Sequence, residues 1–210
     1  MQASFGRSIA RASAARINGL LAASIAASLA AGQTLGNPVY MAPYRAFSTM
    51  ELGGMLADPG PGFALEGAYR YGTGKFDIGI RAGILSVDTM GGNDSYGLIG
   101  ADVRFRVIEH SEDFPLDGSF TGGVGGRLGD SSLLYLPVGL SLGRRIEIEN
   151  GISFVPYFHP VVVPTFGDSS EILVGFGFGV DFRVTRSLDL RVSGGLGDIE
   201  GVAIGISWIK

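Results

Sequence analysis

The sequence contains no cysteine and only two histidines in 210 residues. Disulfides and thiolate metal sites are therefore excluded, and His110 and His159 are too few for a histidine-rich metal centre. Charged residues are scarce at 17%, and the net charge of −4 provides no basic surface for a nucleic acid. We accordingly expect no metal, no cofactor and no nucleic-acid partner.

Long hydrophobic runs are missing after residue 32, although 46% of the chain is hydrophobic and its mean hydropathy is +0.31. Glycine and charged residues interrupt every later run, whereas a transmembrane helix needs about 20 apolar residues. Glycine itself is abundant, with 35 residues and no collagen-like period. The hydrophobic residues must therefore be distributed by alternation rather than by continuous runs.

The start of the chain is basic, with three arginines before residue 17 and no acidic residue before Glu51. The run I-N-G-L-L-A-A-S-I-A-A-S-L-A-A-G follows at 17–32. A basic start, a short apolar run and small residues predict a secretory signal peptide over 1–31, cleaved near Ala30 or Ala31. An amphipathic helix of the mature protein and an organellar transit peptide are the alternatives.

Short alternating runs separated by Gly, Pro, Asn, Asp and Ser clusters fill the rest of the chain, and no helical period is visible. This pattern predicts an extended leader at 32–46 and one all-β domain at 47–210. No connection has room for a parallel crossover, so we expect a closed antiparallel up-and-down barrel with short loops on both sides. The strands are expected near 47–57, 62–71, 75–87, 95–108, 116–128, 132–147, 151–164, 171–184, 187–196 and 201–209. The first of these strands has the weakest pattern. We therefore expect about ten strands, with eight as the alternative count.

The facing of the strands is best seen in E-I-L-V-G-F-G-F-G-V-D-F-R-V at 171–184. Alternate residues of a strand lie on opposite faces, so one face carries Val and Phe while the other carries Gly, Asp181 and Arg183. Other strands repeat this pattern with Gly, Ala and Ser on the second face. A water-facing sheet surface normally carries Thr, Lys, Glu and Gln. We therefore predict that the apolar face contacts lipid and that the small residues line the lumen of a transmembrane barrel. A soluble lipocalin-like carrier is the alternative.

Aromatic residues on the apolar face gather at one level if the strands alternate up and down from a periplasmic start. Aromatic side chains concentrate where a membrane meets water, and a soluble core has no reason to collect them at one level. The predicted aromatic belt consists of Tyr69, Tyr71, Phe76, Phe105, Phe182 and Trp208.

In these features the chain resembles the small bacterial outer-membrane barrels of the OmpA/OmpX kind over roughly 47–210. The last strand, G-V-A-I-G-I-S-W, is similar to the C-terminal signal that such proteins present to the barrel-assembly machinery, although Ile209 and Lys210 follow its aromatic residue. The resemblance implies a monomer in a bacterial, Gram-negative-type outer membrane, in contact with membrane lipid. It assigns no ligand.

Charged residues on the lumen face have nearly balanced signs and fall mostly in the periplasmic half. Unpaired charges in a narrow lumen are costly, so opposite signs are expected to pair into a plug at the barrel floor. Glu51 and Arg127 also face inward, outside that half. The upper half is lined by small residues, which either surround a cavity or only allow close packing. The predicted charge network consists of Glu66, Arg70, Asp77, Arg81, Asp102, Arg104, Arg106, Asp117, Arg145, Asp181, Arg183, Asp189 and Arg191.

The best candidate for catalysis is His159 in F-V-P-Y-F-H-P-V, because some small outer-membrane barrels are enzymes. Ser153 is on the same face but about 20 Å away by strand rise, too far for a nucleophile and its base. We therefore assign no catalytic residue and expect a structural, interaction or small-solute role. A lipid-modifying enzyme, similar to a lipid A deacylase, is the alternative. Pro156, Pro160 and Pro164 predict that this strand is irregular.

Overall fold

The structure is a computed structural model that describes residues 40–43, 50–58, 62–89, 92–148, 152–167 and 170–210. The signal peptide predicted over 1–31 and most of the leader predicted over 32–46 lie outside these residues. Within the described ranges, no helix is long and apolar enough to cross a membrane.

Twelve strand segments make up one sheet. They are β1 (Met50–Asp58), β2 (Gly62–Thr73), β3 (Phe76–Thr89), β4 (Gly92–Ile108), β5 (Asp117–Leu128), β6 (Leu133–Tyr135), β7 (Val138–Gly143), β8 (Ile146–Glu147), β9 (Ser153–Gly167), β10 (Ile172–Thr185), β11 (Leu188–Gly197) and β12 (Gly201–Ile209). All pairings are antiparallel, and each strand pairs mainly with its neighbours in sequence.

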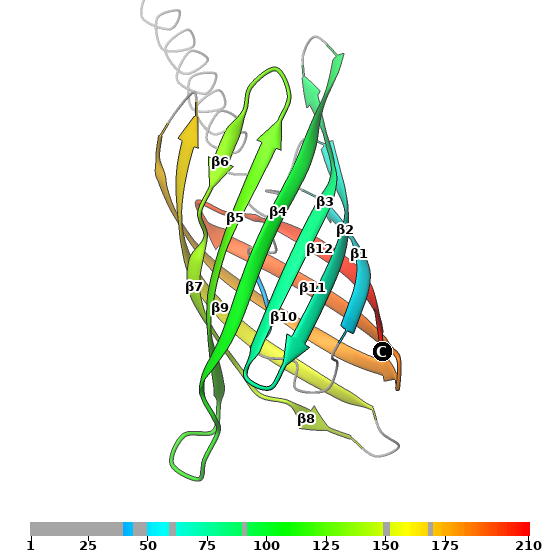
Figure 1. The fold of residues 1–210 in the computed structure, drawn as a ribbon, viewed down its shortest axis with the longest axis vertical. Coiled ribbons are helices and arrows are strands. Elements are labelled where there is room, and N and C mark those ends of the chain that lie inside the picture. The colour runs from blue at the N-terminus through cyan, green and yellow to red at the C-terminus, as the bar shows by residue number, and fades with distance from the viewer. Residues whose placement is uncertain (1–39, 44–49, 59–61, 90–91, 149–151, 168–169) are drawn as a thin grey trace, which may run out of the picture.

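The sheet closes into a barrel because β1 pairs with β2 on one side and with β12 on the other (Figure 1). The segments β6 and β7 both lie between β5 and β9, and β8 continues along β9. These three segments are therefore pieces of one interrupted strand, and the barrel has ten strands. The closed antiparallel barrel is confirmed, and the ten predicted strands match the ten observed ones.

The two gaps in β6–β8 lie beside prolines, with Pro137 inside the first gap and Pro164 and Pro156 of the neighbouring strand opposite the first and the second. Pro156 and Pro164 accept backbone hydrogen bonds from Arg144 and Leu136, but they have no N–H to return. The ladder therefore breaks beside each proline, between β6 and β7 and between β7 and β8. The expectation that the proline-bearing strand itself is irregular was wrong, since β9 is continuous over Ser153–Gly167.

An even number of strands brings both ends of the barrel to one rim. The Lys210 N–H donates to the Met50 carbonyl over 3.0 Å there, and we call this the C-terminal rim. The tight turn between β2 and β3 lies at the same rim and uses Gly74 at a φ of +58°, a conformation that favours glycine. The turn at 198–200, between β11 and β12, lies at the opposite rim.

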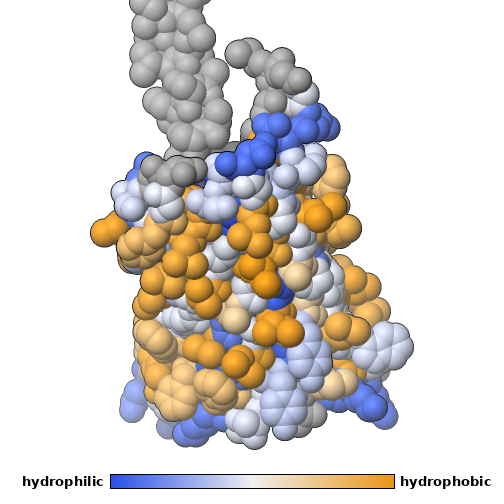
Figure 2. All heavy atoms as spheres, turned by 45° about the horizontal axis from the view of Figure 1, so that its top comes forward, coloured by the Kyte–Doolittle hydropathy of each residue, from blue (hydrophilic) through white to orange (hydrophobic). Residues whose placement is uncertain are grey.

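The barrel is apolar outside and polar inside. Leu52 and Trp208 on the outer face are 61% and 63% exposed, whereas the inward Glu66 and Arg104 are each 2% exposed. Figure 2 shows apolar side chains over the visible wall and polar residues toward its two ends. The distribution reverses that of a soluble barrel and suits a wall surrounded by lipid.

A charge placed on the outer wall tests this orientation. Ile204 lies midway along β12 with its side chain outward, so we expect Ile204→Lys to lower the free energy of unfolding by about 2–4 kcal/mol in lipid vesicles. Glu200→Lys in the exposed turn is the matched control and should cost little. Equal effects of the two substitutions, measured by urea unfolding, would contradict a lipid-facing wall.

Candidate functional site in the barrel lumen

A short piece of the leader, residues 40–43, lies inside the barrel. Tyr40, Met41 and Ala42 are only 4%, 5% and 1% exposed. The Tyr40 hydroxyl donates to the carbonyl of Ile199, 2.7 Å away in the turn at the opposite rim. Residues 40–43 therefore lie in the lumen with Tyr40 near the level of the rim opposite to the one at which β1 begins.

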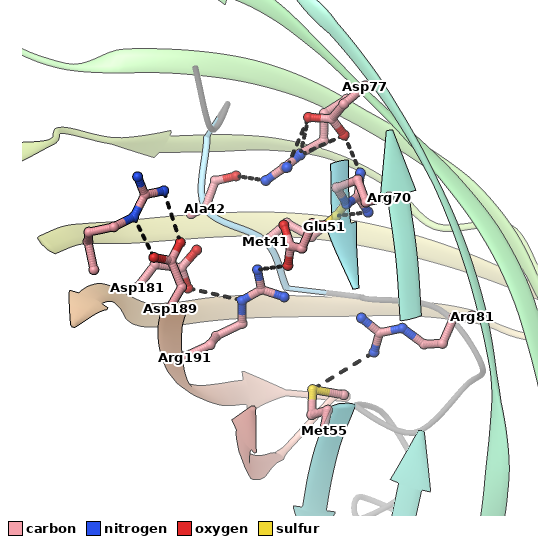
Figure 3. A network of polar contacts seen from close by, with 12 residues as sticks. Met41, Ala42, Glu51, Met55, Arg70, Asp77, Arg81, Asp181, Asp189 and Arg191 are labelled. Atoms are coloured by element: carbon pink, nitrogen blue, oxygen red, sulfur yellow. Dashed lines mark hydrogen bonds and ion pairs between the residues drawn. The ribbon is translucent and has the colours of Figure 1, made fainter. Parts of the chain in front are cut away.

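Wall side chains hold the backbone of this segment. The Met41 N–H donates to Nδ1 of His159 over 3.0 Å, and the Ser141 hydroxyl donates to the Met41 carbonyl. Arg104 donates from Nη1 to the carbonyl of Ala42 over 2.6 Å (Figure 3). Buried backbone groups need such partners, so these contacts fix the leader in place and remove the cost of burying it.

The glycines of β10 make the space for the Tyr40 ring. A Cβ atom added to Gly175 or Gly177 would lie 2.4 or 1.9 Å from an atom of Tyr40, and one added to Gly195 on β11 would lie 2.5 Å away. Larger residues are therefore sterically excluded at these positions while the ring is present. Both faces of the alternating stretch V-G-F-G-F-G are thus explained. Its phenylalanines face outward, and its glycines leave an inward space, which we call the slot, for the Tyr40 ring.

Above the charged region the described lumen contains two apolar clusters. One joins the leader to the wall and includes Tyr40, Ala42, Tyr135, Tyr157, Val161, Val163 and Ile199. The other lies against β1–β4 and β12 and includes Ala57, Ala64, Leu85, Leu98 and Ala203. The small residues expected in the upper half therefore allow close packing of larger side chains between them.

The first part of the charge network lies on β2, β3 and β4. Arg70 forms ion pairs with both Asp77 and Asp102. Arg104 binds the same Asp77 carboxylate through Nε and Nη2, at 2.9–3.1 Å (Figure 3). Asp77 is thus shared by two guanidinium groups, and its two oxygens are directed by charge-assisted hydrogen bonds.

The second part of the charge network joins strands on both sides of the β1–β12 pairing that closes the barrel. Arg191 on β11 pairs with Asp181 on β10 at 3.0 Å and with Glu51 on β1 at 3.3 Å. Glu51, expected outside the network, therefore joins it. Two further pairs complete the set, Arg183 with Asp189 at 2.6 Å and Arg81 with Glu66 at 3.7 Å.

Three further residues predicted for the network form ion pairs at the C-terminal rim. Arg106 pairs with Glu109, Asp117 lies 3.1 Å from the His110 ring, and Arg145 lies 3.4 Å from Glu147. All three are at the C-terminal ends of strands or at strand starts on the C-terminal rim, where the lumen opens to solvent. Their parity is inward, as expected, but their partners are exposed rim residues. The hydrogen bond from Arg106 lowers the pKa of the Glu109 carboxyl.

The residues predicted as an aromatic belt all lie on the outer face in the half toward the C-terminal rim. Phe76 begins β3, and Phe105, Phe182 and Trp208 lie within three residues of the ends of β4, β10 and β12. Tyr69 and Tyr71 lie near the end of β2, and Phe76 and Phe105 are direct partners across β3 and β4. The side chains are between 38% and 63% exposed. Their role at a membrane interface stays a prediction.

His159 is completely buried, and both its ring nitrogens are occupied. Nδ1 accepts from the Met41 N–H, so the neutral ring carries its proton on Nε2, which lies 2.8 Å from the Thr121 hydroxyl. This geometry positions the leader and leaves no nitrogen for a nucleophile. Within the described part of the chain, no three His, Asp or Glu side chains gather as a metal site.

One comparison with a solved structure agrees with this architecture. The β domain of the Bordetella autotransporter Brka aligns with 71% of this chain and 73% of its own, at 19% identity and a TM-score of 0.52. The fold is that of a transmembrane β-barrel. A de novo designed transmembrane β-barrel aligns with 79% of this chain and 98% of its own, at 16% identity and a TM-score of 0.41. A bacterial polysaccharide outer membrane secretin aligns with 71% of this chain and 57% of its own, at 11% identity and a TM-score of 0.42.

No protein-family model matches the chain, and a search of curated proteins finds no match. The transmembrane barrel is thus supported by the fold, while the narrower resemblance to OmpA/OmpX barrels is not. Barrels of that type have about eight strands, whereas this transmembrane barrel closes with ten.

The slot for Tyr40 can be tested by a double-mutant cycle. Gly177→Ala places a methyl group where the ring lies, so we expect unfolding to become easier by about 1–3 kcal/mol. In a Tyr40→Ala background the same change should cost almost nothing. Gly122→Ala, on the outer face with nothing within 3.7 Å of the new Cβ, is the control. If urea unfolding showed that the effects of Gly177→Ala and Tyr40→Ala simply add, the proposed contact between Tyr40 and Gly177 would be contradicted.

Because Asp77 is shared by two buried arginines, removing its charge should cost far more stability than removing the charge of an exposed carboxylate. Asp77→Asn removes one charge from between two buried guanidinium groups, and we expect a loss of about 3–5 kcal/mol in unfolding free energy. Glu147→Gln disrupts a pair whose carboxylate is 72% exposed and should cost less than about 1 kcal/mol. Thermal unfolding of both variants in the same detergent makes the comparison, and similar losses would argue against a buried network.

Proposed function

We propose that this protein is an integral barrel of a bacterial outer membrane whose lumen is closed by its own leader and charge network. Its role is structural or interaction-based rather than transport. The observation that carries the proposal is the location of residues 40–43, which occupy the lumen and contact several parts of the wall. A conducting barrel would leave this space to water.

One polar space between the described lumen residues supports closure. A void lined by Glu51, Arg70, Arg81, Asp102 and Arg191 measures only about 10 Å³, close to the minimum for a single water molecule. Hydrated ions and small solutes need a wider path. Because the charges around the void are paired, opening it requires breaking buried ion pairs, which is energetically costly.

The outer-membrane location and the assembly route are part of the same proposal. Transmembrane barrels of this kind occur in bacterial outer membranes, and a barrel wall with exposed Leu52, Ile206 and Trp208 is insoluble without lipid. We further propose that β12, whose Ile204, Ile206 and Trp208 face outward, presents the C-terminal signal to the barrel-assembly machinery. Fractionation of membranes with heat-shift electrophoresis tests the location.

Planar-bilayer recordings test the closed lumen. We expect the intact protein to show no steady conductance, because the leader and the ion pairs fill the passage. Tyr40→Gly combined with Arg104→Ala removes an anchor at each end of residues 40–43 and should produce openings. Leu56→Ala on the outer wall is the control and should stay closed. Large, steady conductance from the intact barrel would overturn the proposal.

A further inference from the structure

The carboxyl group of Glu66 is buried in the lumen near the middle of β2, where the residue is 2% exposed. Neither of its oxygens has a hydrogen-bond partner among the described residues. The Nε atom of Arg81 lies 3.7 Å from Glu66 Oε2, which is within ion-pair distance but beyond the roughly 2.7–2.9 Å of a charge-assisted hydrogen bond. Instead, Nη1 of Arg81 is directed at the Met55 sulfur, 3.8 Å away (Figure 3). Glu66 and Arg81 are therefore close but share no hydrogen.

In this respect Glu66 differs from the other carboxyl groups of the charge network. Each of those accepts at least one hydrogen bond from an arginine in the described part of the chain. They are Glu51, Asp77, Asp102, Asp181 and Asp189. A buried carboxylate without hydrogen bonds is so costly that such a group generally becomes neutral instead. The geometry thus supports an ionised form for the other five groups and not for Glu66.

The neighbours of Glu66 on the inner face of the sheet offer no polar replacement. Its direct partners across the ladders are Met55 on β1 and Gly83 on β3. A Cβ atom added to Gly83 would lie 2.7 Å from Glu66 Cγ, so the side chain of Glu66 lies against the β3 backbone. Ala64 and Leu85, two residues along β2 and β3, belong to the apolar cluster beside β1–β4. These surroundings favour an uncharged side chain.

The charge balance of the network points the same way. Among the described residues it contains six carboxyl groups and five guanidinium groups, which leaves one negative charge in excess if all are ionised. An uncompensated charge in a narrow lumen is costly. One proton on one carboxyl group removes the excess, and Glu66 is the member whose ionised form has the least support.

The charged groups around Glu66 are arranged consistently with a neutral carboxyl. They are Arg81 on β3, Arg70 on its own strand, Glu51 on β1, Asp102 on β4 and Arg191 on β11, and all five line the small polar void. Arg81 therefore has two other carboxylates, Glu51 and Asp102, at the same void. Arg127 lies three strands along the row of Glu66, about 14 Å away along the sheet, with Leu98 next to it in that row.

We infer that Glu66 keeps its proton at neutral pH and is the proton-binding site of the charge network. In the unfolded chain a glutamic acid loses its proton above about pH 4.3. The folded barrel then binds one proton more than the unfolded chain, so its stability decreases as the pH rises above that value. This inference concerns the folded wall alone and does not depend on whether the lumen conducts.

Urea unfolding in lipid vesicles from about pH 5 to about pH 7 tests the site with Glu66→Gln. Glutamine has the shape of the neutral acid but cannot ionise, so we expect the variant to be at least as stable as the wild type at neutral pH. The ratio of the unfolding constants, wild type over variant, should rise about tenfold per pH unit. A destabilised variant with a ratio that does not change with pH would show an ionised Glu66 paired with Arg81 and would refute the inference.

Glu147→Gln is the matched control, because it makes the same substitution at a carboxyl group that is 72% exposed. Its ratio to the wild type should not change over this pH range. Asp77→Asn, which removes a hydrogen-bonded carboxylate, should weaken the barrel throughout the range. Infrared difference spectra of the folded proteins give a readout that needs no unfolding. At neutral pH we expect the C=O stretch of a protonated carboxyl group in the wild type and its loss in Glu66→Gln, and identical spectra in this region would refute the assignment.

Discussion

The whole structure depends on the closing ladder between β1 and β12. In lipid, an unpaired strand edge would leave a row of backbone groups without partners, at a cost of several kcal/mol each. Pairing from Glu51 with Ile209 to Asp58 with Val202 removes that edge. Closure in turn fixes the even strand number, brings both barrel ends to one rim and creates a lumen that must itself be filled.

Filling the lumen is the second constraint, and it is met in two ways. Near the C-terminal rim, inward charges pair around Asp77 and Arg191. Toward the opposite rim, the leader supplies Tyr40, which fits where the wall carries only glycine. Arg104 binds both Asp77 and the Ala42 carbonyl, so one side chain connects the ion-pair network to the segment 40–43. The leader and the ion pairs therefore stabilise each other.

The strand count and the facing of the strands could be predicted from the sequence, because alternation has a period of two and glycine breaks hydrophobic runs. The pairing of inward charges followed from the cost of burying them. The position of residues 40–43 in the lumen was missed, since these residues have no periodicity, and glycines at 175 and 177 do not by themselves identify the ring that lies against them. The individual partners of Arg106, Asp117 and Arg145 at the rim could not be predicted, because strand stagger cannot be read from one strand alone.

Three glycines of the described barrel illustrate three different physical situations, which separate positions that require glycine from a position that only tolerates it. Gly74 adopts a positive φ in a turn, where side chains are strained. Gly177 faces an aromatic ring that leaves no room for a methyl group, while Gly126 faces outward with room to spare. Only the third situation is unexplained by the fold, because neither backbone conformation nor internal packing selects it. Such a position tolerates glycine without requiring it, which distinguishes it from the glycines of the turn and of the lumen, where a substitution would strain the backbone or displace a ring.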